Sequence, residues 1–207
     1  MVELRTYAFI DTLQPQFASF MATVSQGFLP VAGQAALYLE VAPGMQINRL
    51  TDIAIKATGV YPGLLIVERA FGLLEVHGTS QGDVRQAGDA VLKTLKLKES
   101  DRYRPRKVTD EIIRHVDDYH TQLINRTRHG QMLLGGQTLY ILETEPAGYA
   151  ALAANEAEKA ADINLLEVRA FGAYGRLYLG GEERDVVEGA AAAAGALEGL
   201  KGRSDWK

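Results

Sequence analysis

The strongest constraint on this 207-residue chain is that it contains one sequence pattern twice. Residues 38–44 (YLEVAPG) are echoed by residues 141–147 (ILETEPA), so that a glutamate and a proline recur 103 positions later. Other pairs at this offset are Gly27 with Gly130, Gly33 with Gly136, Gln34 with Gln137, and Lys56-Ala57 with Lys159-Ala160. A collinear series of this length excludes coincidence. We therefore expect two similar domains of about 100 residues each, a common domain size.

Two further matches stand at slightly different offsets. The stretch Arg69-Ala70-Phe71-Gly72 recurs as Arg169-Ala170-Phe171-Gly172 at an offset of 100, and Asp83-Val84 recurs as Asp185-Val186 at an offset of 102. These shifts predict short insertions or deletions in loops. The charged segment 98–107 contains a proline and lacks apolar periodicity, which is typical of a solvated linker. The predicted domains are residues 1–101 and 102–207.

Hydrophobic periodicity predicts the same order of elements in both halves. In the first half it predicts strands over 3–11, 35–42, 62–69 and 71–77, and helices over 15–25, 46–58 and 81–95. The second half repeats this order with alanine-rich helices, notably over 150–161 and 189–197. Hairpin-length links imply antiparallel pairing. The predicted fold class is therefore α/β in the broad sense, with helices and strands in alternation. Because the strands pair antiparallel, it is of the α+β type, with two ferredoxin-like antiparallel sheets flanked by helices.

Composition excludes several classes of protein. The chain is 47% hydrophobic and 23% charged, as expected for a globular protein, and its net charge of −4 argues against a nucleic-acid partner. It has no cysteine, so disulfides and thiolate metal sites are excluded. No apolar run approaches the ~18 residues of a membrane span, and the first residues do not read as a secretory signal. We expect a soluble cytoplasmic protein with no membrane partner and no cofactor.

Enzyme motifs are missing from the sequence. It holds neither a phosphate-binding loop with Gly-Lys-Ser/Thr nor a nucleophile elbow. The run Gly180-Gly181-Glu182-Glu183 is predicted to form a hairpin turn. His115 and His120 would stand about 140° apart on a helix, so no metal site is predicted. The chain is therefore predicted not to be an enzyme.

Two helical segments carry a resemblance to a known family. Residues 51–57 (TDIAIKA) resemble the D-x-x-x-K-A motif of the bacterial microcompartment (BMC) domain, and residues 155–160 (NEAEKA) resemble it with Asn155 in place of the acid. A strand and a helix that usually end this domain come first here, as in its circularly permuted variant. Two permuted copies in tandem resemble the trimeric shell proteins of carboxysomes. Residues 3–7, 66–72, 123–126 and 153–160 also carry this likeness.

The resemblance implies a structural role in a shell. It implies a homotrimer with the outline of a hexamer, a central gated pore for phosphorylated small metabolites, and contacts with other shell proteins at the edges of the tile. Two trimers could also stack as a dimer of trimers. The implied location is the carboxysome shell.

The resemblance also assigns residues to these roles. Glu68 and Arg69 are expected to form the pore gate at the threefold axis, because three such pairs could close a hole with charge-assisted bonds. Phe71, Gly72 and Arg169 are expected to support the pore loop, with Gly72 allowing its turn. The resemblance also places Lys56 and Lys159 at the tile edge. Separately from the resemblance, Asn125, Arg126, Arg128 and His129 form a polar, basic cluster before Gly130. This cluster is read as a possible anion pocket at Asn125 and Arg126, as a contact between stacked trimers, or as a solvated loop.

Two alternatives stay open at this point. One is a trimeric small-molecule-binding regulatory protein of ferredoxin-like fold, and the other is an enzyme with a site between the domains. Short loops and the two edge lysines favour the shell tile. A regulator would more often carry a long mobile effector loop, and the polar residues here are too scattered to indicate catalysis.

Overall fold

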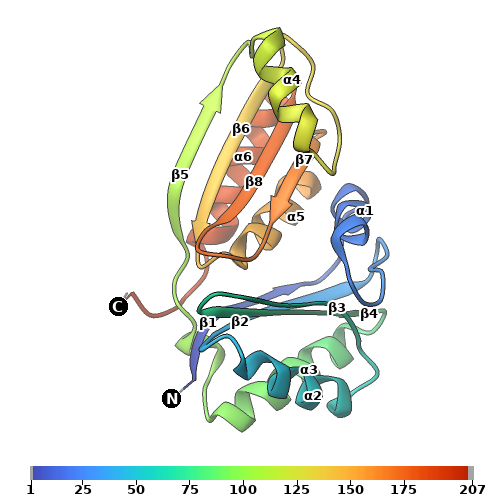
Figure 1. The fold of residues 1–207 in the computed structure, drawn as a ribbon, viewed down its shortest axis with the longest axis vertical. Coiled ribbons are helices and arrows are strands. Elements are labelled where there is room, and N and C mark those ends of the chain that lie inside the picture. Colours follow the sequence, from blue (N-terminus) through green and yellow to red (C-terminus); the bar gives the residue numbers. More distant parts are fainter. Residues whose placement is uncertain (1, 205–207) are drawn as a thin grey trace.

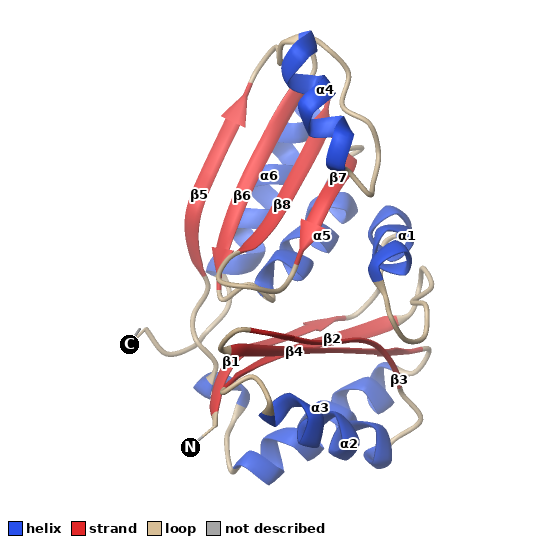
Figure 2. Cartoon of the chain, viewed as in Figure 1, coloured by secondary structure: helices blue, strands red, loops and turns tan. Residues whose placement is uncertain are grey.

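The computed structural model describes residues 2–204 and contains two four-stranded antiparallel sheets, each with two helices on one face and a third on the opposite side (Figures 1 and 2). The first repeat comprises β1 (Glu3–Ile10), α1 (Pro15–Val24), β2 (Ala35–Ala42), α2 (Gln46–Ala57), β3 (Tyr61–Glu68), β4 (Phe71–Gly78) and α3 (Gln81–Leu95). The second comprises β5 (Arg106–Ile113), α4 (Asp118–Thr127), β6 (Thr138–Glu145), α5 (Tyr149–Ala160), β7 (Asn164–Arg169), β8 (Gly175–Gly181) and α6 (Glu183–Glu198). The strand orders are β1-β2-β4-β3 and β5-β6-β8-β7. This confirms the predicted fold class.

The element bounds confirm the repeat. From β1 to α2, each element of the first repeat has a counterpart that starts and ends 103 residues later. The offset of 102 in the last helix is also confirmed, because two residues (79–80) join β4 to α3 whereas one (182) joins β8 to α6. Gly181 ends a strand and Glu183 begins a helix, so the predicted hairpin turn at 180–183 is wrong.

The match at an offset of 100 is not a structural equivalence. Arg169 pairs with Arg176 across the second hairpin as Ile66 pairs with Leu73 across the first, and both pairs of positions are 103 apart. No loop insertion is therefore needed. The second hairpin stops pairing earlier, since β7 ends at Arg169, and the repeated Ala-Phe-Gly letters fall in the loop that follows.

The predicted solvated linker is wrong at its centre. The Arg102 side chain is buried, and its Nη1 donates to the Tyr7 carbonyl oxygen at 2.6 Å while its Nε donates to the Lys201 carbonyl oxygen at 2.9 Å. Tyr103 is buried beside it. A charged residue is stable in such a place because its donors are satisfied by buried acceptors. This segment ties the first sheet to the end of the chain.

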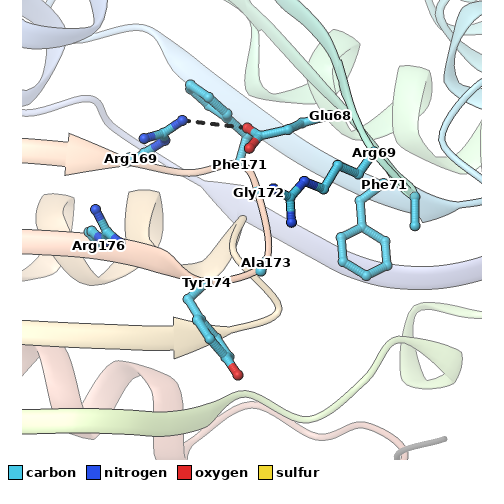
Figure 3. A pocket seen from close by; sticks show the side chains of 10 residues that line it. Glu68, Arg69, Phe71, Arg169, Phe171, Gly172, Ala173, Tyr174 and Arg176 are labelled. Carbon is cyan, nitrogen blue, oxygen red and sulfur yellow. Dashed lines mark ion pairs between the residues drawn. The ribbon is translucent and has the colours of Figure 1, made fainter.

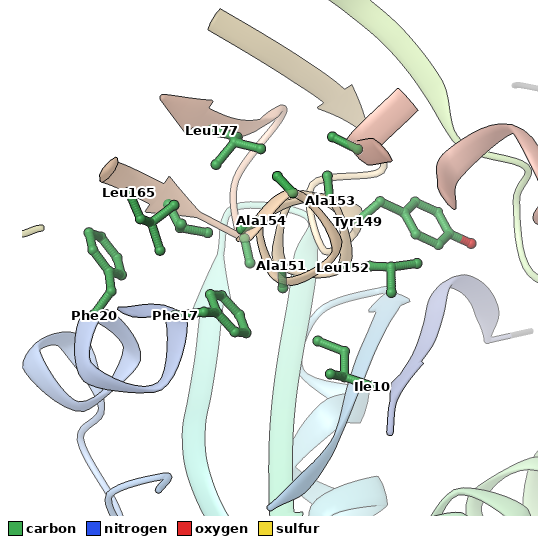
Figure 4. Packing of buried hydrophobic residues seen from close by; sticks show 14 of the residues in the cluster. Ile10, Phe17, Phe20, Tyr149, Ala151, Leu152, Ala153, Ala154, Leu165 and Leu177 are labelled. Carbon is green, nitrogen blue, oxygen red and sulfur yellow. The ribbon is translucent and has the colours of Figure 1, made fainter. Parts of the chain in front are cut away.

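The largest apolar cluster joins the two repeats, as Figure 4 shows. Phe17 and Phe20 of α1 are buried and point toward α5 and Leu165 of the second repeat. The side chains of α5 that meet them are small, including Ala151 and Ala154, so the helix can approach closely. Each buried phenylalanine contributes on the order of 1.5–3 kcal/mol by leaving water.

The N-terminus of α1 receives its caps from α5 rather than from its own residues. The Glu158 carboxylate accepts the backbone N–H groups of Gln16 at 2.7 Å and Phe17 at 2.8 Å. The Asn155 Oδ1 accepts the N–H of Gln14 at 2.9 Å. An anion at the positive end of a helix stabilises it, because the first N–H groups have no partner inside the helix. The first repeat is thus docked on the second by α1.

Candidate functional site

Two hairpins, one from each repeat, come together around one cavity (Figure 3). The turn between β3 and β4 contributes Glu68 and Arg69, and the loop between β7 and β8 lies opposite, between Arg169 and Arg176. The cavity has a volume of about 280 Å³. The structure therefore brings together four of the predicted pore residues, Glu68, Arg69, Phe71 and Arg169, although they are spread over about 100 positions of sequence.

The charges of this cavity are unequal. Three guanidinium groups line it, against the single carboxylate of Glu68, whose Oε2 lies 3.5 Å from Nη2 of Arg169. Arg176 also contacts Glu143, with Nε and Oε1 3.4 Å apart. Within this chain the ion-pair partner of Glu68 is Arg169. The expected pairing of Arg69 with the Glu68 of a neighbouring chain stays a prediction. An excess of guanidinium groups suits anions that accept two hydrogen bonds at once.

Arg69 holds an unusual backbone conformation at the tip of the first hairpin. Its φ is +53°, in the left-handed region that side chains other than glycine rarely adopt. The equivalent position of the second hairpin, 103 residues later, is Gly172, with a φ of +102°. The first repeat therefore keeps a charged residue where the second uses glycine, and backbone strain of this kind concentrates at functional positions.

We expect Arg69→Gly to raise the free energy of unfolding by about 1 kcal/mol, because glycine adopts this conformation without a steric penalty. Arg69→Ala keeps the strain and is the matched control, so it should show no such gain. Urea unfolding of both variants at one protein concentration measures the difference. Equal stabilities of the glycine and alanine variants would contradict the strain.

Gly72 is required for close packing rather than for the turn. A Cβ there would lie 2.2 Å from the Gly44 carbonyl oxygen and 2.7 Å from Cγ2 of Ile47. The N–H of Gly44 donates to the Ala70 carbonyl oxygen at 2.8 Å, so the hairpin tip is fastened to the start of α2. The prediction that Gly72 allows the turn is wrong, since the positive φ belongs to Arg69.

Phe71 is held by a buried ion pair that the sequence analysis missed. The Arg5 guanidinium carbon lies 3.6 Å from the centre of the Phe71 ring, a cation–π arrangement. The Nε of Arg5 donates to Oε1 of Glu40 at 2.6 Å, and Oε2 of Glu40 accepts the N–H of Gly148 at 2.9 Å. Burial raises the pKa of Glu40, and the Arg5 guanidinium opposes that rise. The hairpin between β3 and β4, the first sheet and the second repeat thus share one polar network.

The two lysines proposed for the tile edge are exposed on equivalent helices. The Lys56 side chain is 73% exposed and its Nζ lies 2.8 Å from Oδ2 of Asp52. The Lys159 side chain is 45% exposed and its Nζ lies 3.6 Å from Oδ1 of Asp11. Both lie near the C-terminal end of their helix, where a neighbouring molecule could reach them.

The suggested anion pocket at Asn125 and Arg126 lies away from the hairpin cavity. The Asn125 side chain donates to the Leu133 carbonyl oxygen at 2.7 Å and accepts the Leu133 N–H at 2.9 Å, so it braces its own loop. Arg126 is exposed. The pocket stays a prediction. Within residues 2–204, no three metal-binding side chains cluster, and no helix is long and apolar enough to cross a membrane.

Comparison with known proteins identifies the family. The family model for the CsoS1D N-terminal domain matches residues 4–101. The carboxysome shell protein CcmP of Synechococcus elongatus is 57% identical over 202 residues, which cover 98% of this chain and 95% of the relative. The relative is named as a structural protein, which agrees with the prediction that this chain is not an enzyme and favours a shell role over a regulatory one.

Two solved structures share the fold along the full chain. The fused permuted hexameric shell protein MSM0275 from the RMM microcompartment is 48% identical with a TM-score of 0.94, over 98% of this chain and 100% of its own. The double ringed trimeric shell protein MSM0271 from the same microcompartment is 39% identical with a TM-score of 0.95, over 99% and 100%. This chain therefore belongs to the family of tandem, permuted BMC-domain shell proteins that includes the carboxysome proteins CcmP and CsoS1D.

Proposed function

We propose that the protein is a homotrimeric, pseudohexameric tile of a carboxysome shell, in which residues 1–101 and 102–207 each supply one BMC domain. The similarity to a double ringed trimeric shell protein supports the trimer and the stacking of two rings. Three chains would contribute six pore hairpins around one axis. The meeting of both hairpins of a chain at one cavity is the observation that carries this proposal.

The pore opens and closes by rearranging the ion pairs between hairpins. In the closed state, guanidinium groups of Arg69 and Arg169 bind the Glu68 carboxylates and fill the opening. In the open state they turn outward and present cationic donors to a passing anion, which suits phosphorylated small metabolites. A short hairpin that can pack in two discrete ways gives two states rather than a continuum.

We expect Glu68→Gln to reduce the proportion of rings with a closed pore, because the amide cannot form the ion pairs. Cryo-electron microscopy of the purified ring, sorted by pore diameter, measures that proportion. Arg184→Gln is the control, since Arg184 is 88% exposed and pairs with the adjacent Asp185, away from the hairpins. An unchanged closed fraction in Glu68→Gln would show that this carboxylate is not the latch.

Lys56 and Lys159 form the contacts between neighbouring tiles. Their apolar stems can lie along an adjoining surface while each ammonium group meets backbone carbonyl oxygens. A Lys56→Asp, Lys159→Asp variant is expected to keep its ring mass and to lose the ability to form extended sheets on negative-stain grids. Sheets of unchanged extent would show that neither lysine is needed for the contacts between tiles.

A further inference from the structure

Two arginines stand directly opposite each other across the second hairpin. Arg169 of β7 pairs with Arg176 of β8, and both side chains line the cavity between the two hairpins, called the hairpin cavity below (Figure 3). Their equivalents in the first repeat, Ile66 and Leu73, are apolar. Like charges at opposed positions of a sheet destabilise the strand pair, so an anion between the two guanidinium groups would stabilise it. The exchange of two apolar residues for two cations therefore points to an anion site.

The Glu68 carboxylate reaches this site but is held loosely there. Its Oε2 lies 3.5 Å from Nη2 of Arg169, which is longer than the about 2.7–2.9 Å of a charge-assisted hydrogen bond. The Glu68 side chain is 36% exposed and that of Arg169 is 43% exposed, so water screens the pair. Glu68 is therefore a weakly bound occupant that a stronger anion can replace.

The other two guanidinium groups of the cavity also keep donors available. Nε of Arg176 lies 3.4 Å from Oε1 of Glu143, whose other oxygen already accepts the Thr109 hydroxyl at 2.7 Å. Arg69 is exposed and forms no ion pair within the described residues 2–204. Three positive charges against the one negative charge of Glu68 leave a net charge of two around about 280 Å³. Because guanidinium groups present planar forks of N–H donors, this space suits a dianion with several oxygens.

Competition with Glu68 makes the site selective. Glu68 belongs to the chain, and a tethered ligand of this kind acts at an effective concentration in the millimolar range. A free carboxylate offers the arginines no more than Glu68 already does, so it cannot displace Glu68 at lower concentrations. A phosphomonoester carries about −1.5 to −2 charges at pH 7 and three strong acceptor oxygens, so it can bind Arg169 and Arg176 together. Glu68 therefore sets a threshold that dianions pass and monoanions do not.

We infer that the hairpin cavity binds phosphate dianions in competition with Glu68, and that this exchange releases the pore from its closed state. The inference rests on the proposed pore and adds what opens it: the anion takes the arginine that holds the Glu68 carboxylate. Glu68 is then the residue that determines which anions open the pore. Binding itself requires only one chain, because both hairpins of the cavity belong to the same chain.

Isothermal titration calorimetry tests the competition. Inorganic phosphate, glycerol phosphate and acetate are titrated at about pH 8 and equal ionic strength, where phosphate is mostly a dianion. Both phosphates should saturate the wild-type protein and acetate should not; tighter binding of glycerol phosphate would assign the site to phosphomonoesters. Glu68→Gln should bind phosphate about two- to fivefold more tightly, because it removes a competitor worth as much as an exposed ion pair.

Two arginine variants complete this titration. Arg169→Gln should bind phosphate about tenfold more weakly, since it removes charged donors of the site. Arg184→Gln is the matched control and should bind as the wild type does, because Arg184 is 88% exposed and pairs with Asp185 away from the hairpins. Circular dichroism should show all variants folded. Equal phosphate affinities of the wild type and Glu68→Gln, or phosphate binding no tighter than acetate binding, would overturn the inference.

Cryo-electron microscopy of the ring, sorted by pore diameter, tests the opening. Saturating phosphate should raise the fraction of wild-type rings with an open pore, and acetate at the same ionic strength should leave it unchanged. If Glu68→Gln opens the pore but phosphate does not, this inference is wrong and the proposed gate stands. If neither phosphate nor Glu68→Gln changes the open fraction, the proposed gate is refuted together with its regulation.

Discussion

Replacing Glu40 by alanine is expected to lower the free energy of unfolding by about 3–5 kcal/mol. The change leaves the buried Arg5 guanidinium without its counter-charge and removes the acceptor of the Gly148 N–H. Removing one partner of a buried ion pair is costly because the remaining charge is neither paired nor hydrated. Urea unfolding at one fixed protein concentration, followed by circular dichroism, measures the loss.

Glu143→Ala is the matched control, since Glu143 stands at the equivalent position of the second repeat. Its side chain is 25% exposed and its arginine partner, Arg176, is 49% exposed, so solvent screens the pair. We expect the control to lose no more than about 1 kcal/mol. Similar losses for the two variants would contradict the view that burial makes the Glu40 network decisive.

Gly72→Ala is expected to lower the free energy of unfolding by about 3 kcal/mol, the upper part of the usual range for overpacking. The added methyl group would stand 2.2 Å from the Gly44 carbonyl oxygen, and backbone atoms cannot easily give way. Gly175→Ala should lose a similar amount, because its methyl group would lie 2.2 Å from the Ala147 carbonyl oxygen. Thermal and urea unfolding measure both changes.

Gly59→Ala is the control for this pair, because no atom lies within 4 Å of the Cβ that it would add. It should change stability by no more than about 0.5 kcal/mol. If Gly72→Ala were as stable as this control, the close contact between the hairpin tip and the start of α2 would be refuted.

Hydrophobic periodicity and the repeat were sufficient to predict most of the fold. The first-repeat strands and helices predicted from the pattern end within one residue of those observed. The pattern works because each element has one apolar face, and burying that face decides the local structure. The expectation that Glu68, Arg69 and Arg169 act together came from a family resemblance, and the structure brings these residues to one cavity.

Properties that depend on contacts between distant residues could not be predicted in this way. Identical letters suggested that Arg169 is the counterpart of Arg69, whereas strand pairing makes Gly172 the counterpart. Residue identities alone cannot decide whether Arg69 aligns with Arg169 or with Gly172, because the strand register is set by hydrogen bonds with the neighbouring strand. The capping of α1 by Glu158 could not be predicted either, since the bonded residues are more than 140 positions apart in the sequence.

The sequence contains one weak indication of the buried Arg5–Glu40 ion pair. Glu40 stands in an otherwise apolar strand and recurs as Glu143, and an acid in such a place implies a buried partner. The partner could not be named from sequence, because Arg5 is the bulged residue between the two paired positions Leu4 and Thr6. A bulge shifts the alternation of faces and so hides the residue from a periodicity analysis.

The most direct test of the central claim is the structure of the wild-type assembly by cryo-electron microscopy. We predict a ring with three times the 22.5 kDa mass of one chain, or a stacked pair of such rings, with the Glu68-Arg69 hairpins surrounding a central hole. Alternate conformations of these hairpins should distinguish open from closed rings. A ring that places the hairpins on its outer rim, or a chain that remains monomeric, would contradict the account.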